Sequence, residues 1–330
     1  MRDEGQVDVL GAVEVGRRVS VRRRVDGGLT DVVGHLLDAV SGPAGRLTVL
    51  RRDGEVVDID TAAVTAAKVV PAAPVRKGWE VPAVSADDMQ RICWAGWPAR
   101  EVEMLGDWAL RAHGGITGRA NSVMAVGDPG RPLRDALDAV RGWYAARDLP
   151  PQVQLPLADP ANRQMAELGW ERLHVTVVQV APIAALLATM SAPEVKDLRV
   201  VVEPTPSPTW LSLMHDLDDN DPESHVAILT GPELVGFVTV RRGDEPVGIG
   251  RVSVEGTWAG VTSVDVAPTA RRQGVASAVM RSLLTWAHKQ GAASSYLQVR
   301  AANAAALRLY AGLGYATHHP YGYRAPRTQA

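Results

Sequence analysis

The sequence predicts a chain of mixed α and β structure in three parts, a small SH3-like β-barrel followed by two α/β segments. Residues 1–75 carry five short strand patterns with no helical pattern between them. A linker with two prolines, residues 70–74, follows them. Beyond it, residues 76–190 and 191–330 each alternate strand and helix patterns in a similar order. A chain of 330 residues is too long for one ordinary domain and long enough for three.

The strand patterns of residues 1–75 are short and end at turn residues. Asp53-Gly54, typical of a hairpin turn, lies between apolar runs at 47–50 and 56–59. The other strand patterns cover residues 19–22, 29–40 and 64–70. Five strands without a helix favour a small barrel.

Five arginines lie between Arg17 and Arg24 and raise the possibility of nucleic-acid binding. No aromatic residue interleaves them to stack on a base. Carboxylates elsewhere in the barrel balance their charge. The sequence therefore favours a solvated barrel face, and nucleic-acid binding remains the alternative.

Composition bounds the cellular setting. The net charge of −2 gives no general attraction to nucleic acid or anionic membranes. Cys93 is the single cysteine, so no disulfide within the chain and no cysteine zinc cluster can form. The charged residues 1–4 lack an apolar signal core, and the apolar run 175–190 is broken by Gln179 and Pro182. We therefore expect a cytoplasmic protein without a membrane span, of undetermined oligomeric state and without a metal.

The segment 76–190 predicts a helix at 86–110, a strand at 116–126 and a helix at 132–147. A strand at 151–157, a helix ending at Gly169 and a strand at 173–180 follow. The polar, glycine-rich run 114–122 fits either bulges at a cleft or an ordinary loop.

The segment 191–330 predicts a first strand at 198–202 and a helix at 210–217. Strands follow at 225–229, 234–240, 249–254 and 261–266. A helix with an apolar face formed by Val275, Val279 and Leu283 comes next, then a strand at 296–300. Asn303 is predicted to cap a last helix that ends at residues 312–314.

The two α/β segments share a pattern. Trp143, Gln154 and Gly169 in the first have counterparts Trp286, Gln298 and Gly314 in the second, at nearly equal spacing. An internal duplication of roughly 140 residues accounts for this agreement.

An arginine-rich turn precedes a helix pattern in the second segment. The strand ends at Pro268, and Arg271 and Arg272 lead through Gly274 into the helix. The first N–H groups of a helix lack internal partners and carry partial positive charge, so a pyrophosphate can bind there. Gly274 has no side chain to block that approach, and Ala276 is almost as small. The turn therefore predicts an anion site made of backbone.

This turn resembles the phosphate-binding signature of the GNAT (Gcn5-related) N-acetyltransferases. Residues 271–276 read R-R-Q-G-V-A and fit R/Q-x-x-G-x-G/A, and residues 301–315 read A-A-N-A-A-A-L-R-L-Y-A-G-L-G-Y, as in that family. The resemblance covers about residues 234–318. It implies a tandem GNAT fold, in which the first half is degenerate and the second catalyses.

The resemblance also implies where acetyl-CoA binds. Two parallel strands, 261–267 and 294–300, would splay apart around it, and Asn303 lies where family members often contact the cofactor. Its pantetheine would meet the backbone of Val264, Asp265 and Val266. Its pyrophosphate would bind Arg271, Arg272, Gln273, Gly274, Val275, Ala276 and Ser277.

Tyr310 lies at the family's general-acid position. A tyrosine with a pKa near 10 stays protonated at neutral pH and can protonate the leaving thiolate; a plain core tyrosine is the alternative. Gln298 stands where some relatives that acetylate protein N-termini carry Glu, and it can orient a water or the acceptor but cannot take a proton. The base stays open among Glu255, Asp265, His215 and His225.

The first half lacks this machinery. Its counterpart of the phosphate turn, residues 126–132, contains Asp128, which repels phosphate, and two prolines, which lack N–H donors. Met165 stands at the place of Tyr310 and cannot donate a proton. We expect this half to bind the acceptor or support the core.

The resemblance implies an acetyl-CoA-dependent N-acetyltransferase acting on a primary amine. The three-part layout also resembles actinobacterial GNAT proteins with an N-terminal barrel, one of which carries a histone-acetyltransferase label, and this hints at a protein lysine. A small amine metabolite is the alternative, and a CoA-sensing or nucleic-acid-binding module with a vestigial site is the non-enzyme alternative. An acidic run fits either attraction of a cationic acceptor or a solvated turn: Asp216, Asp218, Asp219, Asp221 and Glu223.

Overall fold

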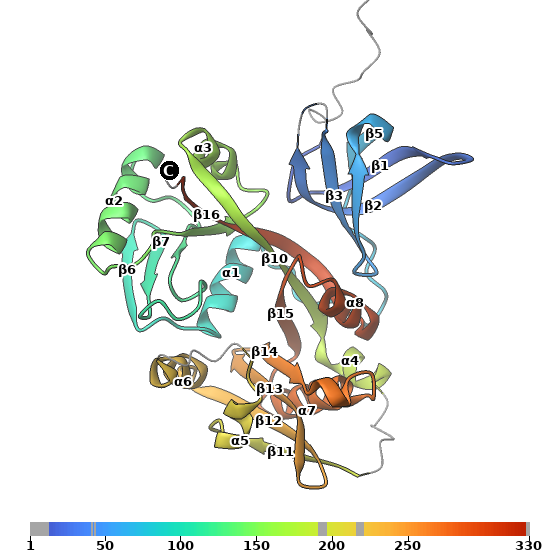
Figure 1. The fold of residues 1–330 in the computed structure, drawn as a ribbon, viewed down its shortest axis with the longest axis vertical. Helices are drawn as coiled ribbons and strands as arrows, with labels where there is room; N and C mark the ends of the chain where they lie inside the picture. The colour runs from blue at the N-terminus through green and yellow to red at the C-terminus, as the bar shows by residue number, and fades with distance from the viewer. Residues whose placement is uncertain (1–12, 41, 43, 191–196, 216–220, 328–330) are drawn as a thin grey trace, which may run out of the picture. The chain divides into compact units, whose positions relative to one another are not determined.

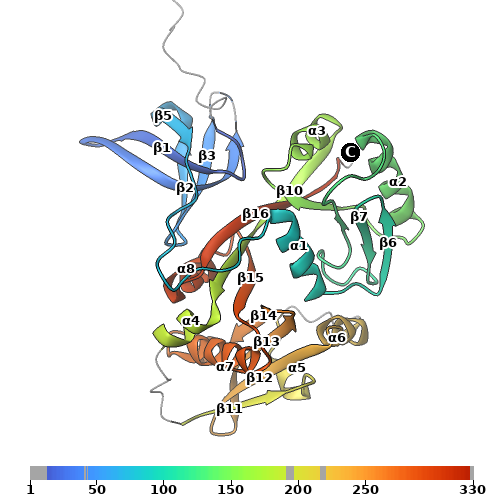
Figure 2. The same cartoon turned by 180° about the vertical axis from the view of Figure 1, so that it is seen from behind.

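The computed structural model describes residues 13–40, 42, 44–190, 197–215 and 221–327, drawn as ribbons in Figures 1 and 2. The chain forms two compact units, each assembled from separate stretches of sequence. One unit comprises residues 1–76, 154–179 and 299–330, and the other comprises residues 77–153 and 180–298. No helix in the described ranges has the length and apolar character needed to cross a membrane.

The first unit begins with a five-stranded antiparallel sheet in the order β4-β3-β2-β1-β5, drawn in blue in Figure 1. Its elements are β1 (Arg18–Val25), β2 (Gly28–Val40), β3 (Arg46–Arg51), β4 (Val56–Asp60), the 3-10 turn η1 (Thr61–Ala63) and β5 (Val64–Val69). Alternate residues point into a core that includes Val19, Val21, Leu36, Leu47 and Ile59. The five strands predicted from the sequence are confirmed.

The arginines of this small β domain lie largely on a solvated face. Arg22 donates from Nε to Asp31 Oδ1 at 2.8 Å across the β1–β2 pair, and both side chains are substantially exposed. Arg17 pairs with Glu14 in the same exposed manner. Exposed pairs of this kind add little to stability.

The rest of the first unit contains most of β9 (Val153–Pro156), α3 (Ala161–Glu167), most of β10 (Trp170–Pro182), α8 (Ala304–Leu313) and β16 (Ala316–Pro326). β16 lies between β10 and β9. The buried Arg324 of β16 donates to Asn162 Oδ1 at 3.0 Å and to the Trp170 carbonyl at 2.7 Å. These bonds join α3, β10 and β16, which come from distant parts of the sequence.

The second unit opens with α1 (Ala86–Ala95), β6 (Glu101–Leu105), β7 (Trp108–Ala112), β8 (Val123–Met124) and α2 (Leu133–Ala145). The predicted helix at 86–110 is wrong beyond Ala95. Gly106, at φ 58°, turns residues 101–112 into a hairpin instead. The predicted strand at 116–126 shrinks to two residues, because the polar run before it folds as a loop.

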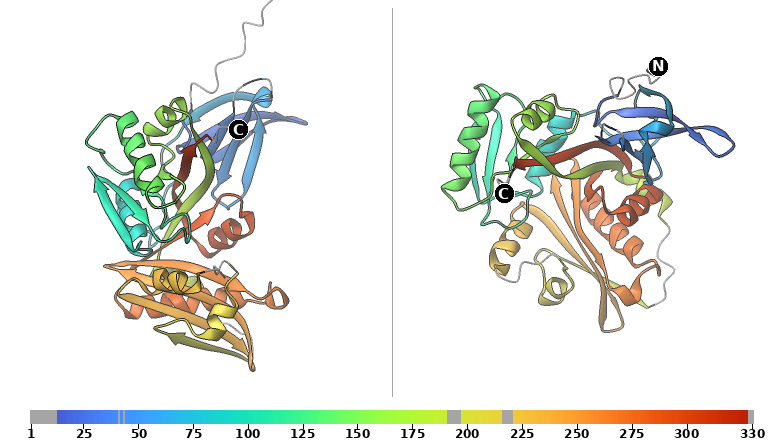
Figure 3. Two further views of the ribbon diagram at one scale, coloured as in Figure 1. Left: turned by 60° about the vertical axis from the view of Figure 1, so that its left-hand side comes forward. Right: turned by 45° about the horizontal axis from the view of Figure 1, so that its top comes forward.

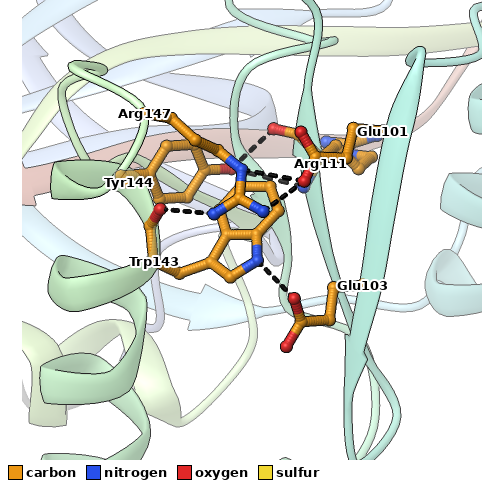
Figure 4. Close-up of polar contacts among 6 residues, drawn as sticks. All are labelled: Glu101, Glu103, Arg111, Trp143, Tyr144 and Arg147. Carbon is orange, nitrogen blue, oxygen red and sulfur yellow. Dashed lines mark hydrogen bonds and ion pairs between the residues drawn. The ribbon is translucent and has the colours of Figure 1, made fainter.

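Helix α2 is joined to the β6–β7 hairpin by polar contacts (Figure 4). Trp143 Nε1 donates to Glu103 Oε2 at 2.7 Å, and Arg147 Nε donates to Glu101 Oε1 at 2.9 Å. Tyr144 Oη donates to the Arg111 carbonyl at 2.8 Å, and burial raises the pKa of this phenol. The helix is thus fixed on the hairpin.

The remainder of the second unit is built on the strand order β11-β12-β13-β14-β15. Its elements are α4 (Ile183–Thr189), β11 (Leu198–Glu203), α5 (Pro208–Ser212), α6 (Pro222–Thr230), β12 (Leu234–Arg242), β13 (Glu245–Glu255), β14 (Trp258–Val266), the 3-10 turn η2 (Pro268–Ala270), α7 (Val275–Lys289) and β15 (Ser294–Arg300). The predicted strand at 225–229 is wrong: these residues lie in α6, which Asp221 caps and Pro222 begins. The helix predicted at 210–217 ends at Ser212.

Helix α7 covers one face of these strands. A Cβ at Gly248 or Gly250 would lie 2.6 Å from Val275 or Val279 respectively, so the two glycines allow the helix to pack closely. The opposite face packs against α5 and α6, where Trp210 meets the ring of Phe237. The right-hand view of Figure 3 shows α7 on one side of the strands and α5 and α6 on the other.

Candidate active site

Strands β14 and β15 pair over only part of their length. Their parallel ladder runs from Trp258 and Ser294 to Val261 and Leu297 and then ends. Just beyond, Ser263 has φ 51°, and the register between β13 and β14 shifts at this point. A positive φ in a non-glycine strand residue marks a bulge, which leaves backbone groups without a ladder partner. The splay expected from the family resemblance is therefore present at the end of β14.

The turn after β14 leads into α7 through residues with left-handed backbone. Arg272 has φ 59° and Gly274, the N-cap of α7, has φ 79°. Gln273 Nε2 donates to the Thr269 carbonyl at 2.8 Å, and Arg271 Nε donates to the Val266 carbonyl at 3.3 Å. No side chain at the N-cap bonds to the first N–H groups of α7. The turn is exposed, and its side chains bond to the backbone of the same turn. The N-terminus of α7 is therefore open to an anion.

The predicted cofactor residues of β14 and of this turn lie close together along the chain, in the second unit. Val264, Asp265 and Val266 occupy the splayed end of β14, and residues 271–277 form the turn and the first turn of α7. Left-handed Gly274, the bulge and the separated strands fit a nucleotide thioester bound through backbone. The cofactor role of these residues remains a prediction.

Two residues that the sequence offered separately as bases lie together. His215 Nδ1 is 3.3 Å from Asp265 Oδ1. Asp265 pairs with Ile249, so it lies on the sheet face opposite α7, with α5 and α6. The side chains are 55% and 32% exposed, so the imidazole is accessible. An aspartate that orients a histidine is the usual arrangement of a general base.

The other candidate bases lie elsewhere. Glu255 pairs with Trp258 at the hairpin turn, at the opposite end of β14 from the bulge. His225 is buried in α6. Gln298 is half-buried on β15, directly after the ladder with β14 ends. Of the acidic run, Asp216, Asp218 and Asp219 lie outside the described residues.

Asn303 and Tyr310 belong to the first unit. Asn303 Oδ1 accepts a hydrogen bond from the Ala306 N–H at 3.0 Å, which confirms the predicted cap of α8. Tyr310 is 9% exposed, and its ring lies edge-on to Tyr315 at 5.9 Å between centroids. Their proposed roles toward the cofactor remain predictions.

The first-half counterpart of the phosphate turn is filled by its own chain. Asp107 Oδ2 accepts a bond from the Asp128 N–H at 2.9 Å, and Asp128 Oδ1 accepts one from the Gly130 N–H at 2.8 Å. Carboxylates thus occupy the donors that a phosphate would need. Met165 is fully buried in α3.

Sequence reasoning missed a group of buried and half-buried residues on the sheet face opposite α7. Arg251 of β13 is fully buried, and burial lowers its pKa to about 9. Trp97 and Arg119 lie beside it. The one available signal was a charged residue inside the apolar strand pattern 249–254.

Comparison with known proteins finds one family match for the N-terminal β domain and another for most of the remaining chain. Residues 87–324 match the family described as "Probable histone acetyltransferase Rv0428c C-terminal", and residues 13–68 match "Rv0428c N-terminal Sm-like domain". A Mycobacterium tuberculosis protein named probable histone acetyltransferase Rv0428c is 30% identical over 94% of both chains.

Two further likenesses concern the acetyltransferase part. The uncharacterized N-acetyltransferase YobR of Bacillus subtilis is 28% identical over 72% of this chain and 98% of its own. A tandem GNAT protein from the clavulanic acid biosynthesis pathway has a similar structure, with a TM-score of 0.52 at 11% identity over 72% of this chain and 86% of that one. The fold is therefore a tandem GNAT fold preceded by a small β domain of Sm-like type, where the sequence suggested an SH3-like outline.

Proposed function

Since the chain belongs to the family of probable histone acetyltransferase Rv0428c and is a GNAT N-acetyltransferase, we propose that it transfers the acetyl group of acetyl-CoA to a primary amine by direct attack. The observation that carries the proposal is the splayed end of β14 followed by the left-handed turn at Gly274. A strand that opens beside a helix N-terminus offers backbone donors to a long, anionic ligand.

The residues that would hold acetyl-CoA are those of β14 and the turn. The backbone of 264–266 would bind the pantetheine amides, and residues 271–277 would bind the pyrophosphate through N–H groups and two arginines. When bound, acetyl-CoA supplies a thioester whose carbonyl an uncharged amine can attack.

We propose that His215 is the general base that accepts the proton of the attacking amine. Its imidazole is oriented by Asp265 at 3.3 Å, and the pair lies beside the bulge on the face that also carries α5 and α6. A histidine beside a carboxylate is a common general base. Gln298, at the start of the splayed part of β15, would orient the acceptor or a water.

Tyr310 is proposed to protonate the departing sulfur. A phenol keeps its proton at neutral pH, and the thiolate of CoA can take it once the carbon–sulfur bond breaks. The proposal rests on the position of Tyr310 in the family motif and on its place in α8.

The acceptor has two candidate classes. The name of the Mycobacterium tuberculosis relative supports a lysine of a basic protein, and the acidic run around Asp221 is compatible with it. Asp221 itself caps α6 by accepting the Ser224 N–H at 3.0 Å, and hydrogen bonds from the Ser224 side chain and from this N–H lower its pKa. A small amine is the other class. A cytoplasmic location remains a prediction.

The experiment measures thermal or urea unfolding with and without acetyl-CoA, followed by mass spectrometry of products. A ligand at a hundredfold excess over its Kd stabilises the native state by about 2.7 kcal/mol. Stabilisation with transfer to an amine supports the enzyme. Stabilisation without any product across amines, peptides and basic proteins favours a CoA-sensing module, and no stabilisation rejects acetyl-CoA as the ligand. Duplex DNA in the same assay tests the Sm-like domain.

A further inference from the structure

Two guanidinium groups approach one indole ring in the second unit. The Cζ atoms of Arg119 and Arg251 lie 4.5 Å and 5.2 Å from the ring centroid of Trp97. None of the salt bridges formed by the described residues involves either arginine. Two positive charges therefore share a partly desolvated environment without a carboxylate partner.

The buried charge of Arg251 is stabilised mainly by hydrogen bonds to backbone carbonyls. Its Nε donates to the Leu229 carbonyl at 2.7 Å, and its Nη2 donates to the Gly96 carbonyl at 3.2 Å. Leu229 lies in the last turn of α6 and Gly96 is the C-cap of α1, so both carbonyls belong to the negative ends of helix dipoles. Nη1 donates to Thr262 Oγ1 at 3.2 Å. The role of Arg251 is structural.

Arg119 lacks such compensation. The side chain is half-buried, and its Nη1 is buried without a hydrogen-bond partner. Removing a charged donor from water without a partner is costly. Stacking on Trp97 offsets only part of this desolvation free energy. A ligand oxyanion that enters beside this half-buried side chain would supply the acceptor that Nη1 lacks.

The loop that carries Arg119 is held rigidly. Asn121 Oδ1 accepts bonds from the His113 and Gly115 N–H groups at 2.7 and 3.0 Å. Its Nδ2 donates to the Ile116 and Thr117 carbonyls at 2.7 and 2.9 Å. The glycine-rich run that the sequence left open as bulges or a loop is thus a loop closed around one amide.

The ring under Arg119 is fixed by the same loop. Trp97 Nε1 donates to Thr117 Oγ1 at 3.0 Å, and Thr117 has φ 59°. A guanidinium stacked on an indole that is itself anchored has few orientations, so its N–H fork is preorganised.

This cluster lies on the acceptor side of the sheet as the proposed function defines it. Arg251 bonds to Thr262, which directly precedes the bulge at Ser263. Arg251 pairs with Phe237 and Thr262, on the face opposite α7. Asp265, with His215, lies on that same face beyond the bulge. The base and the arginine cluster therefore flank one stretch of β14.

We propose that Arg119 binds an oxyanion of the acceptor, so that the acceptor is a small molecule carrying both a primary amine and a carboxylate or phosphate. The inference rests on the proposed function and specifies its acceptor. The planar fork of arginine matches both oxyanions. Lysine-rich protein segments would bring further positive charge toward two guanidinium groups, which repel it.

The experiment compares matched acceptors with the full chain and acetyl-CoA. A panel of α- and ω-amino acids is assayed against the corresponding amides, and phosphoethanolamine against ethanolamine. Because hydrogen bonds to charged groups are the stronger ones, we expect kcat/KM to favour at least one oxyanion-bearing acceptor about tenfold or more over its neutral partner. The two arms distinguish carboxylate from phosphate.

Variants assign the preference to Arg119. Arg119→Gln should abolish the discrimination by raising KM for the charged acceptor, with the neutral acceptor unaffected. Arg119→Lys keeps the charge without the fork and should retain part of the preference. The matched control is Arg91→Gln, which removes an exposed arginine of α1 that pairs with Asp88 and should keep the full preference. Melting curves verify that each variant folds.

Four results overturn the proposal. One is that the wild type acetylates both members of every pair equally well. Another is that it prefers a lysine-rich peptide. A third is that Arg119→Gln lowers activity on both members equally, which indicates a structural role. Calorimetric titration of the panel into the protein without acetyl-CoA tests the site independently of catalysis, and equal binding by wild type and Arg119→Gln rejects it. Failure of acetyl-CoA to bind would instead reject the proposed function.

Discussion

Replacing Gly274 by alanine tests the turn that carries the functional proposal. Gly274 has φ 79° at the N-cap of α7. An alanine held in this left-handed region costs about 1–2 kcal/mol, and its smaller entropy in the unfolded state returns about 0.4–1 kcal/mol. The net loss of unfolding free energy is therefore about 1 kcal/mol.

Gly291 provides a matched control. It has φ 97° just beyond the other end of α7, and a Cβ there would meet open space. Gly291→Ala should therefore lose a similar amount of stability. Only Gly274→Ala places a methyl group where the pyrophosphate is proposed to approach.

The assay combines urea unfolding with calorimetric titration of acetyl-CoA. Loss of one hydrogen bond to a charged group is worth about 1.5–3 kcal/mol, so Gly274→Ala should raise the Kd of acetyl-CoA about tenfold to hundredfold. Gly291→Ala should leave this Kd unchanged. Equal acetyl-CoA affinity in the two variants would refute the placement of the pyrophosphate on this turn.

Four further predictions concern catalysis and stability. Tyr310→Phe should lower kcat about hundredfold in a thiol-release assay, and full kcat across the pH range would reject the acid role. His215→Asn should lower kcat/KM by a similar factor; an unchanged kcat/KM points to another base. Burial lowers the pKa of His35 to about 4 and that of His319 to about 3, so below about pH 6.5 the unfolded chain binds more protons. Unfolding free energy should then fall by up to about 1.4 kcal/mol per pH unit for each histidine between about pH 6.5 and 4, a slope that glutamine substitutions should flatten. Arg251→Met removes the donors to the Leu229 carbonyl, the Gly96 carbonyl and Thr262 Oγ1 and should cost about 1–3 kcal/mol in urea unfolding; no measurable loss would contradict its structural role.

Local signals predicted those parts of the fold that local chemistry decides. Asp53-Gly54 marked a hairpin, Gly274 marked a helix start, and Asn303 marked a cap, because each residue type acts on the backbone next to it.

The errors arose where a short apolar run has no decisive period. Residues 225–229 read as a strand by composition, but the cap at Asp221 and Pro222 at the first helical position begin a helix there. Residues 108–112 are buried on both faces of their strand, so the alternation that distinguishes a strand from a helix is missing.

The candidate site was only partly accessible to sequence reasoning for a related reason. The phosphate turn is contiguous, so its motif is visible. The contacts of His215 with Asp265 and of Arg119 with Trp97 join residues far apart in the chain. No local pattern encodes them, because they exist only once α1, α5 and the sheet have packed.

The position of β16 between β10 and β9 sets the order in which the protein can mature. A ribosome delivers β9 and β10 well before β16, the strand that must insert between them. Until then, both nascent strands expose unsatisfied hydrogen-bonding edges that invite pairing with other chains. Holding by a chaperone during translation is therefore expected, and a premature stop before residue 316 should yield aggregates rather than a smaller soluble enzyme.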